Sequence, residues 1–228
     1  KPRAVDAKIR LGFLSADLCH HPVAHFIEPI FLEYDRERFE IVAYGDQRKS
    51  DDFSARFATQ VDLWRETSSY DDKALAKLIH EDRVDILFEL AGHTAYNRLG
   101  VFALKPAPVQ VSYLGYPGTT GLPAIDFRIT DAFADPQGTT EHLHTEKLIR
   151  VPECAWCFQP GDSTPEVEPL PALKNGYVTF GCFNNMAKLN PALFEVWAEI
   201  LIRVSGSHLR LKARTLTDDE KAAGKALF

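Results

Sequence analysis

The segment Val84-Asp85-Ile86-Leu87-Phe88-Glu89-Leu90 is apolar at most of its positions. A strand with one face in water would alternate apolar and polar residues, whereas this pattern is typical of a strand covered on both faces. Strands of that kind belong to parallel sheets, whose crossover helices pack on both sides. Residues 84–90 therefore predict an α/β fold.

The sequence before this segment alternates between strand and helix patterns. Strands are predicted at residues 9–14, 39–44 and 61–64. A helix is expected to begin at Pro22 with an apolar stripe, in which Pro29 removes one backbone bond and favours a kink. A second helix is predicted from the cap residue Ser69 through Asp82.

The same alternation continues after residue 90. A helix is expected at about 99–104, and strands near 109–114, 125–130 and 148–151. Residues 1–151 are therefore predicted to form a Rossmann-like, doubly wound parallel sheet. Ligands of such sheets bind at the carboxyl ends of the strands, which puts the loops after Leu14, Leu90 and Leu114 at the expected site.

The composition changes at Pro152. Residues 152–175 are rich in proline and lack periodicity, so they are interpreted as a linker. Residues 176–228 resume the alternation, with strands at 177–183 and 209–212, a helix opening at Asn190, and a capping box that begins a last helix at Thr217. These elements are too few to bury a full core, so we expect the start of a second, truncated Rossmann-like domain.

Charge and composition exclude several classes of protein. The net charge is −6 and no run of Lys or Arg is present, which argues against a non-specific nucleic-acid binder. No apolar stretch has the length of a membrane span, and the first residues do not resemble a signal peptide. Four cysteines in 228 residues do not form a disulfide scaffold. A cytoplasmic protein without nucleic-acid or membrane partners is expected.

The first candidate site is the turn that precedes the helix at Pro22. The ring of His21 is expected near the free N–H groups of that helix, whose positive end favours a neutral ring able to accept or share a proton. Asp17, four residues earlier, could orient the ring or pass on a proton. The alternative is purely structural: His21 caps the helix, and Asp17 makes a turn bond.

Two further loops follow predicted strands. Residues 115–121 contain three glycines and two threonines, which permit close backbone approach to a ligand or simply form a tight turn. Residues 184–188 end in Lys188 beside a helix N-terminus, a place suited to phosphate, although a solvated loop lysine is equally expected.

The remaining histidines and cysteines give weaker indications. His93 follows the strand at 84–90, and His25 and His80 fall on predicted helices; all three fit structural roles. Cys154 and Cys157 have CxxC spacing, but no second pair exists to complete a zinc site, and Trp156 beside them favours packing. No metal site is predicted.

Several of these segments together resemble the catalytic region of the O-linked N-acetylglucosamine transferase family, including its plant SPINDLY-like members. The resemblance spreads over nearly the whole chain. Its most specific pieces are the motifs KPAPVQVSYLGYPGTTG, at residues 105–121, and CFNN with KLNP, at residues 182–191. Residues 9–15, 84–94 and 126–131 match in the same order, as do Asp17, His21 and Pro22.

This resemblance implies an inverting, metal-independent protein O-glycosyltransferase of the glycosyltransferase B type, with the donor between two Rossmann-like domains and Ser or Thr of intracellular proteins as acceptor. His21 matches the active-site histidine, Asp17 an acidic residue linked to proton removal, and Lys188 the lysine that neutralises the leaving diphosphate. The donor is expected to contact the matching residues Pro22, Leu114, Gly115, Tyr116, Pro117, Gly118, Thr119, Asn185 and Lys188.

The chain also departs from the family pattern. Val23 stands where animal members have a threonine, Ala187 replaces an aromatic residue, and Asn185 takes the position of a glutamine. Tetratricopeptide repeats are expected upstream in the parent protein, and this piece alone is expected to have little activity. UDP-N-acetylglucosamine is the first choice of donor and GDP-fucose the second; a degenerate, non-catalytic binding module and an epimerase remain alternatives.

Overall fold

The computed structural model describes residues 7–160 and 164–213. The chain divides into two compact units, Lys1–Asp162 and Ser163–Phe228, and each is treated by itself. The boundary between them falls inside the proline-rich stretch 152–175. The helix predicted from Thr217 lies outside the described residues. None of the helices in the described ranges has the length and apolar character needed to cross a membrane.

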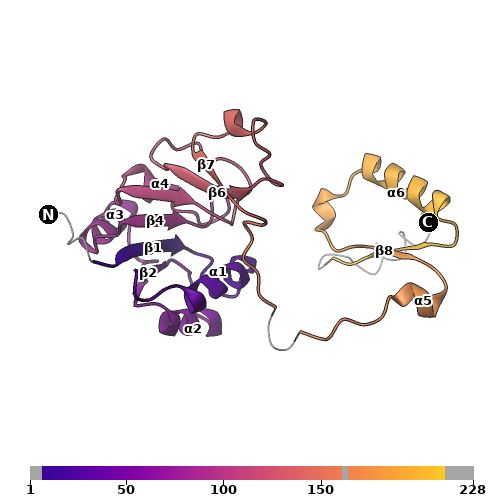
Figure 1. Ribbon diagram of the computed structural model, residues 1–228, viewed down its shortest axis with the longest axis horizontal. Helices are drawn as coiled ribbons and strands as arrows, with labels where there is room; N and C mark the ends of the chain where they lie inside the picture. Colours follow the sequence, from indigo (N-terminus) through magenta and orange to yellow (C-terminus); the bar gives the residue numbers. More distant parts are fainter. Residues whose placement is uncertain (1–6, 161–163, 214–228) are drawn as a thin grey trace. The chain divides into compact units, whose positions relative to one another are not determined.

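The first unit contains a seven-stranded sheet in which every neighbouring pair is parallel, as predicted (Figure 1). The strand order is β3-β2-β1-β4-β5-β6-β7. The strands are β1 (Ile9–Ser15), β2 (Phe39–Gly45), β3 (Leu63–Glu66), β4 (Ile86–Glu89), β5 (Val109–Ser112), β6 (Phe127–Asp131) and β7 (Lys147–Val151). The order reverses between β1 and β4, and such a switch point is where doubly wound sheets bind ligands.

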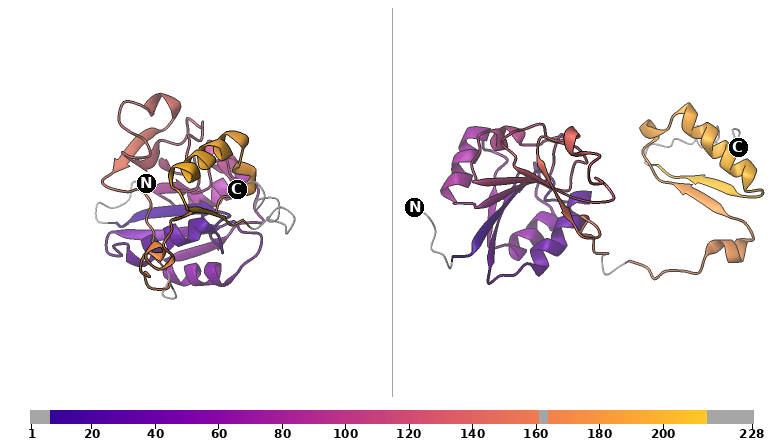
Figure 2. Two further views of the ribbon diagram at one scale, coloured as in Figure 1. Left: turned by 90° about the vertical axis from the view of Figure 1, so that its right-hand side faces the viewer. Right: turned by 45° about the horizontal axis from the view of Figure 1, so that its top comes forward.

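Side chains of the central strands alternate between two apolar cores, one on each face of the sheet. Phe13 of β1 packs in one core with residues of α1 (Pro22–Glu33) and with Phe57 of α2 (Asp52–Gln60). Leu14 packs in the other core with α3 (Asp72–Glu81) and α4 (Leu99–Ala103). The helices therefore cover both faces, as the oblique view in Figure 2 shows. This double cover explains why residues 84–90 are apolar at most of their positions.

Helix α1 begins where it was predicted and continues past Pro29 to Glu33. The missing N–H of Pro29 costs one backbone bond. Ile27 and Phe31, both fully buried against the sheet, hold the helix on either side of the proline. Packing of this apolar stripe outweighs the local effect of the proline.

Two predictions about local structure were wrong, the cap of the helix at 72–81 and the start of the strand at Val61, and two helices were not anticipated. Helix α3 is capped by Asp71, whose carboxylate accepts the N–H of Ala74, and not by Ser69. Helix α2 was not anticipated, and because Val61 ends it, β3 starts only at Leu63. Residues 171–175 form a short helix, α5 (Pro171–Asn175), within the stretch interpreted as a linker; Pro171 starts it and Gly176 ends it in the left-handed conformation.

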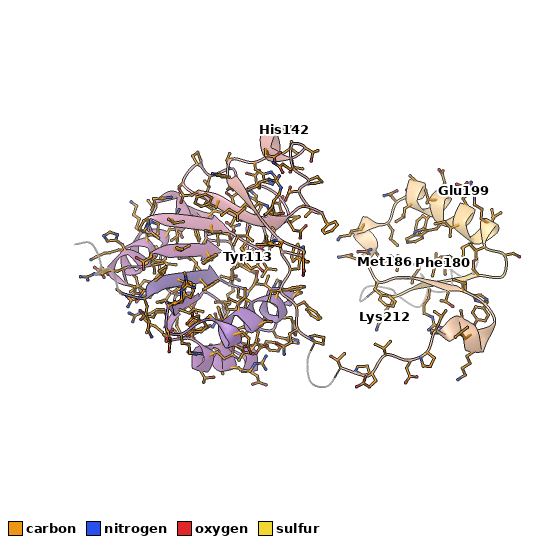
Figure 3. All side chains as sticks on the ribbon, viewed as in Figure 1. Tyr113, His142, Phe180, Met186, Glu199 and Lys212 are labelled. Carbon is orange, nitrogen blue, oxygen red and sulfur yellow. The ribbon has the colours of Figure 1, made fainter. Side chains whose placement is uncertain are left out.

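The segment that leaves β7 is fixed to the first unit before the boundary is reached. The hydroxyl of Tyr113, labelled in Figure 3, donates to the carbonyl of Ala155 at 2.7 Å. The N–H of Ala155 donates to the carboxylate of Asp131 at 2.9 Å. The rings of Trp156 and Phe158 pack against Phe26 of α1. Residues up to 158 therefore belong structurally to the first unit.

The second unit is built on one strand-helix-strand crossover. Strands β8 (Thr179–Cys182) and β9 (His208–Leu211) are parallel and are joined by the turn η2 (Met186–Lys188) and helix α6 (Pro191–Arg203). An apolar hollow of about 380 Å³ lies between the strands and α6, lined chiefly by Phe180, Leu193, Trp197, Ile200 and Leu209. None of the described residues 164–213 is fully buried, because one helix over two strands cannot enclose a core.

Candidate functional site

The turn between β1 and α1 places Asp17 and His21 at the carboxyl edge of the sheet. The Oδ1 atom of Asp17 lies 3.7 Å from Nδ1 of His21. The side chain of Asp17 is 14% exposed and that of His21 43%, so the ring is open to a ligand and the carboxylate lies behind it. Burial raises the pKa of Asp17, and the nearby His21 opposes that shift.

The ring of His21 also caps helix α1. Its Nδ1 atom accepts the N–H of Val23 at 3.3 Å, so the hydrogen of a neutral ring resides on Nε2. The structural role anticipated for His21 is thus real, and it leaves the other nitrogen free for a ligand. Pro22 is exposed at the first helical position, whereas Val23 is buried in the apolar core.

The β1–α1 turn is held from two sides. The N–H of Asp17 donates to the hydroxyl of Ser15 at 2.9 Å. The N–H of His20 donates to the carboxylate of Asp51 at 2.7 Å, and the same carboxylate caps helix α2 through the N–H of Ser54. Leu18 is fully buried and anchors the middle of the turn. These contacts fix the backbone that carries Asp17 and His21.

The predicted donor loop, residues 114–119, follows β5 at the same edge of the sheet. Leu114 is buried in the left-handed conformation (φ 80°), and Pro117 is exposed. The guanidinium of Arg128 donates to the carbonyls of Tyr116 and Gly118, at 2.8 and 3.1 Å. The side chain of Arg128 is itself buried.

Glu146 fixes the far end of this loop. It accepts a hydrogen bond from the hydroxyl of Thr119 at 2.7 Å, and it also accepts from the backbone and the hydroxyl of Thr120. Burial opposes ionisation of Glu146, but these hydrogen bonds outweigh burial and lower its pKa. The loop is therefore pre-formed by a buried cation and a buried anion, so a ligand that it binds would pay little for ordering it.

The loops after β4 and β5 pack tightly together. An added Cβ on Gly115 would collide with the carbonyl oxygen of Leu90. An added Cβ on Gly92, which has φ 55°, would collide with the side chain of Tyr116. The rings of His93 and Tyr116 meet edge to face, with centroids 5.2 Å apart. Both glycines are thus required for close approach of the backbone.

Gly115→Ala is expected to lower the free energy of unfolding by about 3 kcal/mol, because the methyl group displaces the Leu90 backbone. Urea unfolding followed by circular dichroism measures this. Gly118→Ala is the matched control, since its Cβ would meet only ring atoms of Tyr116, the nearest at 3.2 Å. Equal stability of the two variants would show that the loops are not packed as described.

Sequence reasoning missed three residues that shape the site: Glu89, Arg128 and Glu146. All three are buried charged residues. The sequence does contain a signal for Glu89, because it is an acid near the carboxyl end of an otherwise apolar strand. The pairing of Arg128 and Glu146 with residues 116–120 depends on tertiary contacts, and no local pattern in the sequence signals it.

In the second unit, Asn185 and Lys188 lie on the turn between β8 and α6. Asn185 caps η2 by accepting the N–H of Ala187 at 3.1 Å. Asn190 caps α6 in the same way through the N–H of Leu193. Lys188 is exposed, and no described carboxylate of its own unit lies within ion-pair distance. An ammonium group beside a helix N-terminus is suited to an anion such as phosphate.

The structure thus gathers Asp17, His21, Pro22 and residues 114–119 at the carboxyl edge of the first sheet, and Asn185 and Lys188 on one turn of the second unit. The other candidates have structural surroundings. His25 packs against Phe53, and His80 lies in the last turn of α3. Cys154 and Cys157 are free and exposed.

Comparison with known proteins gives consistent matches over most of the chain. The sequence profile described as Glycosyl transferase family 41 matches residues 1–164. The protein named "Probable UDP-N-acetylglucosamine--peptide N-acetylglucosaminyltransferase SPINDLY" of Oryza sativa subsp. japonica is 44% identical over 222 residues, which are 96% of this chain and 24% of that protein. The protein of the same name from Arabidopsis thaliana is 43% identical over 92% of this chain and 23% of its own length.

A solved structure gives the same result in three dimensions. The structure titled as a mutant of the Thermobaculum terrenum O-GlcNAc transferase is similar to this chain with a TM-score of 0.89 and 32% sequence identity. The match covers 97% of this chain and 42% of that one. This chain spans about a quarter of the length of the curated relatives it matches.

Proposed function

Because the chain belongs to glycosyltransferase family 41, we propose that its protein transfers a sugar from a nucleotide donor to Ser or Thr hydroxyls of intracellular proteins. The observation that supports this most directly is the Asp17–His21 pair beside the strand-order switch point, at the same edge of the sheet as the pre-formed loop at 114–119. A ligand held by that loop would lie at the edge where doubly wound sheets bind their substrates.

The proposed reaction is an inverting displacement at the sugar. The acceptor oxygen attacks C1 from one side, and the bond from C1 to the diphosphate oxygen breaks on the other, with its electron pair leaving on the diphosphate. The proton of the acceptor hydroxyl is taken up by the carboxylate of Asp17, and the open ring of His21 contacts the reacting groups through its Nε2–H.

We propose that Lys188 neutralises the charge that develops on the diphosphate, so that no metal ion is needed. Lys188 is exposed and stands in the chain between the cap residues of η2 and α6, and the N-terminus of α6 carries a positive potential. A charge-assisted bond to a phosphate oxygen gains strength as that oxygen becomes more negative. Pro22, Leu114 and Asn185 complete the proposed contacts with the donor.

UDP-N-acetylglucosamine is the proposed donor, and GDP-fucose is the second candidate. The SPINDLY relatives, which are named for UDP-N-acetylglucosamine, support the first choice, and the solved O-GlcNAc transferase supports the same sugar. We further propose a parent protein with tetratricopeptide repeats before this region, in the cytoplasm, as the resemblance implies.

The full-length product of the gene, incubated with either donor and a Ser/Thr peptide, is expected to transfer N-acetylglucosamine. Mass spectrometry of the peptide identifies the sugar by its added mass. Transfer of fucose alone would assign the second donor. Donor consumption without any acceptor present would indicate an epimerase or hydrolase instead.

A non-catalytic binding module is the second candidate function, and the replacements at Val23 and Ala187 favour it. Calorimetric titration separates the two. A pure binding module would hold nucleotide or peptide without ever transferring sugar, and His21→Ala would leave its affinity unchanged.

A further inference from the structure

Glu89 is the last residue of β4 and one of the most deeply buried acids of the first unit, with an exposed fraction of 2%. Its carboxylate is hydrogen-bonded to the backbone of the turn at residues 90–92, which follows the strand. Oε1 accepts the N–H groups of Ala91 and Gly92 at 2.6 and 2.7 Å, and Oε2 accepts the N–H of Gly92 at 2.8 Å. Successive backbone N–H groups of this kind form an anion-binding nest, which Glu89 fills from its own strand.

The turn that Glu89 holds supports the proposed donor loop. Gly92 lies directly against Tyr116, and the next residue, His93, packs its ring on the ring of Tyr116. On the neighbouring strand, the N–H of Tyr113 donates to the carbonyl of Glu89 at 2.9 Å. A shift of the Glu89 side chain would therefore be transmitted to the loops after both β4 and β5.

Glu89 also lies next to the β1–α1 turn. The parallel register pairs Leu14 with Glu89, so the turns after β1 and β4 begin side by side at the switch point. The charged groups that face Glu89 are Asp17 from the β1–α1 turn and Arg128 from β6. Arg128 is itself shared with Asp135 and Glu146. Two acids, Asp17 and Glu89, therefore interact at the switch point.

We propose that Glu89 is a positioning residue for sugar transfer: it holds the turn at 90–92 against the donor loop and places a second carboxyl group beside Asp17. This inference rests on the proposed function. It assigns a role in the reaction to a residue that does not touch the substrates.

The proposal has a consequence for pH. Burial raises the pKa of Glu89 to about 7, against the lowering effect of the bonds from Ala91 and Gly92; Asp17 raises it further and Arg128 lowers it. As pH rises through 7, Glu89 gains its charge, and a second anion beside Asp17 makes that carboxylate a better proton acceptor. Activity is therefore expected to rise over this range.

Glu89→Gln separates the charge from the hydrogen bonds, because its amide oxygen can still accept from Ala91 and Gly92. In the full-length protein, kcat/KM for sugar transfer is expected to rise several-fold between about pH 6 and 8, and Glu89→Gln is expected to lose that rise. KM for the acceptor peptide should change little. Asp82→Asn is the control: Asp82 is a buried acid that bonds Tyr44 at the end of α3, away from the loops of the site, and its variant should keep the wild-type pH profile.

Unfolding of the chain supplies a readout that does not need activity. The folded protein holds the Glu89 proton up to about pH 7, whereas the unfolded chain releases it near its ordinary value of 4.5. Stability is therefore expected to fall as pH rises from about 5 to 8, and Glu89→Gln should reduce that fall. Glu89→Ala, which leaves both N–H groups unpaired, should be less stable than Glu89→Gln at every pH.

The outcomes are distinct. If kcat/KM of Glu89→Gln rises with pH in the same way as that of the wild type, the inference is overturned and the proposed function is left intact. If the wild-type protein transfers no sugar, the proposed function fails, and the unfolding data then decide: a pH slope that is the same in wild type and Glu89→Gln overturns the inference as well.

Discussion

Lys188→Ala is expected to lower kcat for sugar transfer by about 10²- to 10³-fold, the usual cost of removing one preorganised group that meets developing charge. The expectation follows from the position of the ammonium group, which is exposed on the turn before α6 and has no described carboxylate partner in its own unit. Its interaction with a diphosphate would strengthen as the bond to the sugar breaks. The effect should thus fall on kcat more than on KM for the donor.

Steady-state kinetics of the full-length protein test this expectation. Lys188→Arg retains the charge and should recover part of the activity. Lys212→Ala is the matched control, since Lys212 lies near the ring of Phe183 on the same unit and is given no part in catalysis. A Lys188→Ala enzyme within about threefold of wild type would remove the lysine from the mechanism.

His21→Ala is expected to lower kcat/KM by about 10²- to 10⁴-fold, the range associated with a positioned acid-base group. The substitution also removes the cap of α1, which costs about 1 kcal/mol of stability. His21→Asn separates these effects. Asparagine is a good cap for the N–H of Val23 but has no ring to share a proton. It should restore the stability without restoring transfer.

His20→Ala provides the control for this position. The ring of His20 stacks on Phe53, and its backbone N–H, which bonds Asp51, is unaffected by the substitution. Activity close to that of wild type is expected. An active His21→Asn variant would mean that capping is the whole contribution of this residue.

The parallel sheet could be predicted from the sequence because residues 9–14, 39–44 and 84–90 are mostly apolar runs. Such runs are typical of strands that are covered on both faces. Helix α2 could not. Of its nine residues, only Ser54 and Phe57 are buried, so it shows little of the apolar stripe that marked α1. The cap of α3 was misassigned because Ser69 and Asp71 are both good caps, and only the hydrogen bond to Ala74 separates them.

The candidate site likewise contains residues that sequence patterns can locate and residues that they cannot. Asp17, His21 and residues 114–119 stand at strand ends, which the alternation of elements locates. The groups that fix them are Asp51, Arg128 and Glu146, which come from other elements and meet the site only through tertiary contacts. Sequence patterns locate the edge of the sheet that binds; they do not identify the residues that make that edge rigid.

The position of β1 inside the sheet has a consequence for biosynthesis. Its two hydrogen-bonding partners are β2, which follows closely, and β4, which ends only at Glu89. At a translation rate of about 5–20 residues per second, β4 is synthesised several seconds after β1. Until then, the edge of β1 that pairs with β4 has no partner strand. During that interval the nascent chain exposes an unpaired strand, the kind of surface to which chaperones bind and through which newly made chains aggregate.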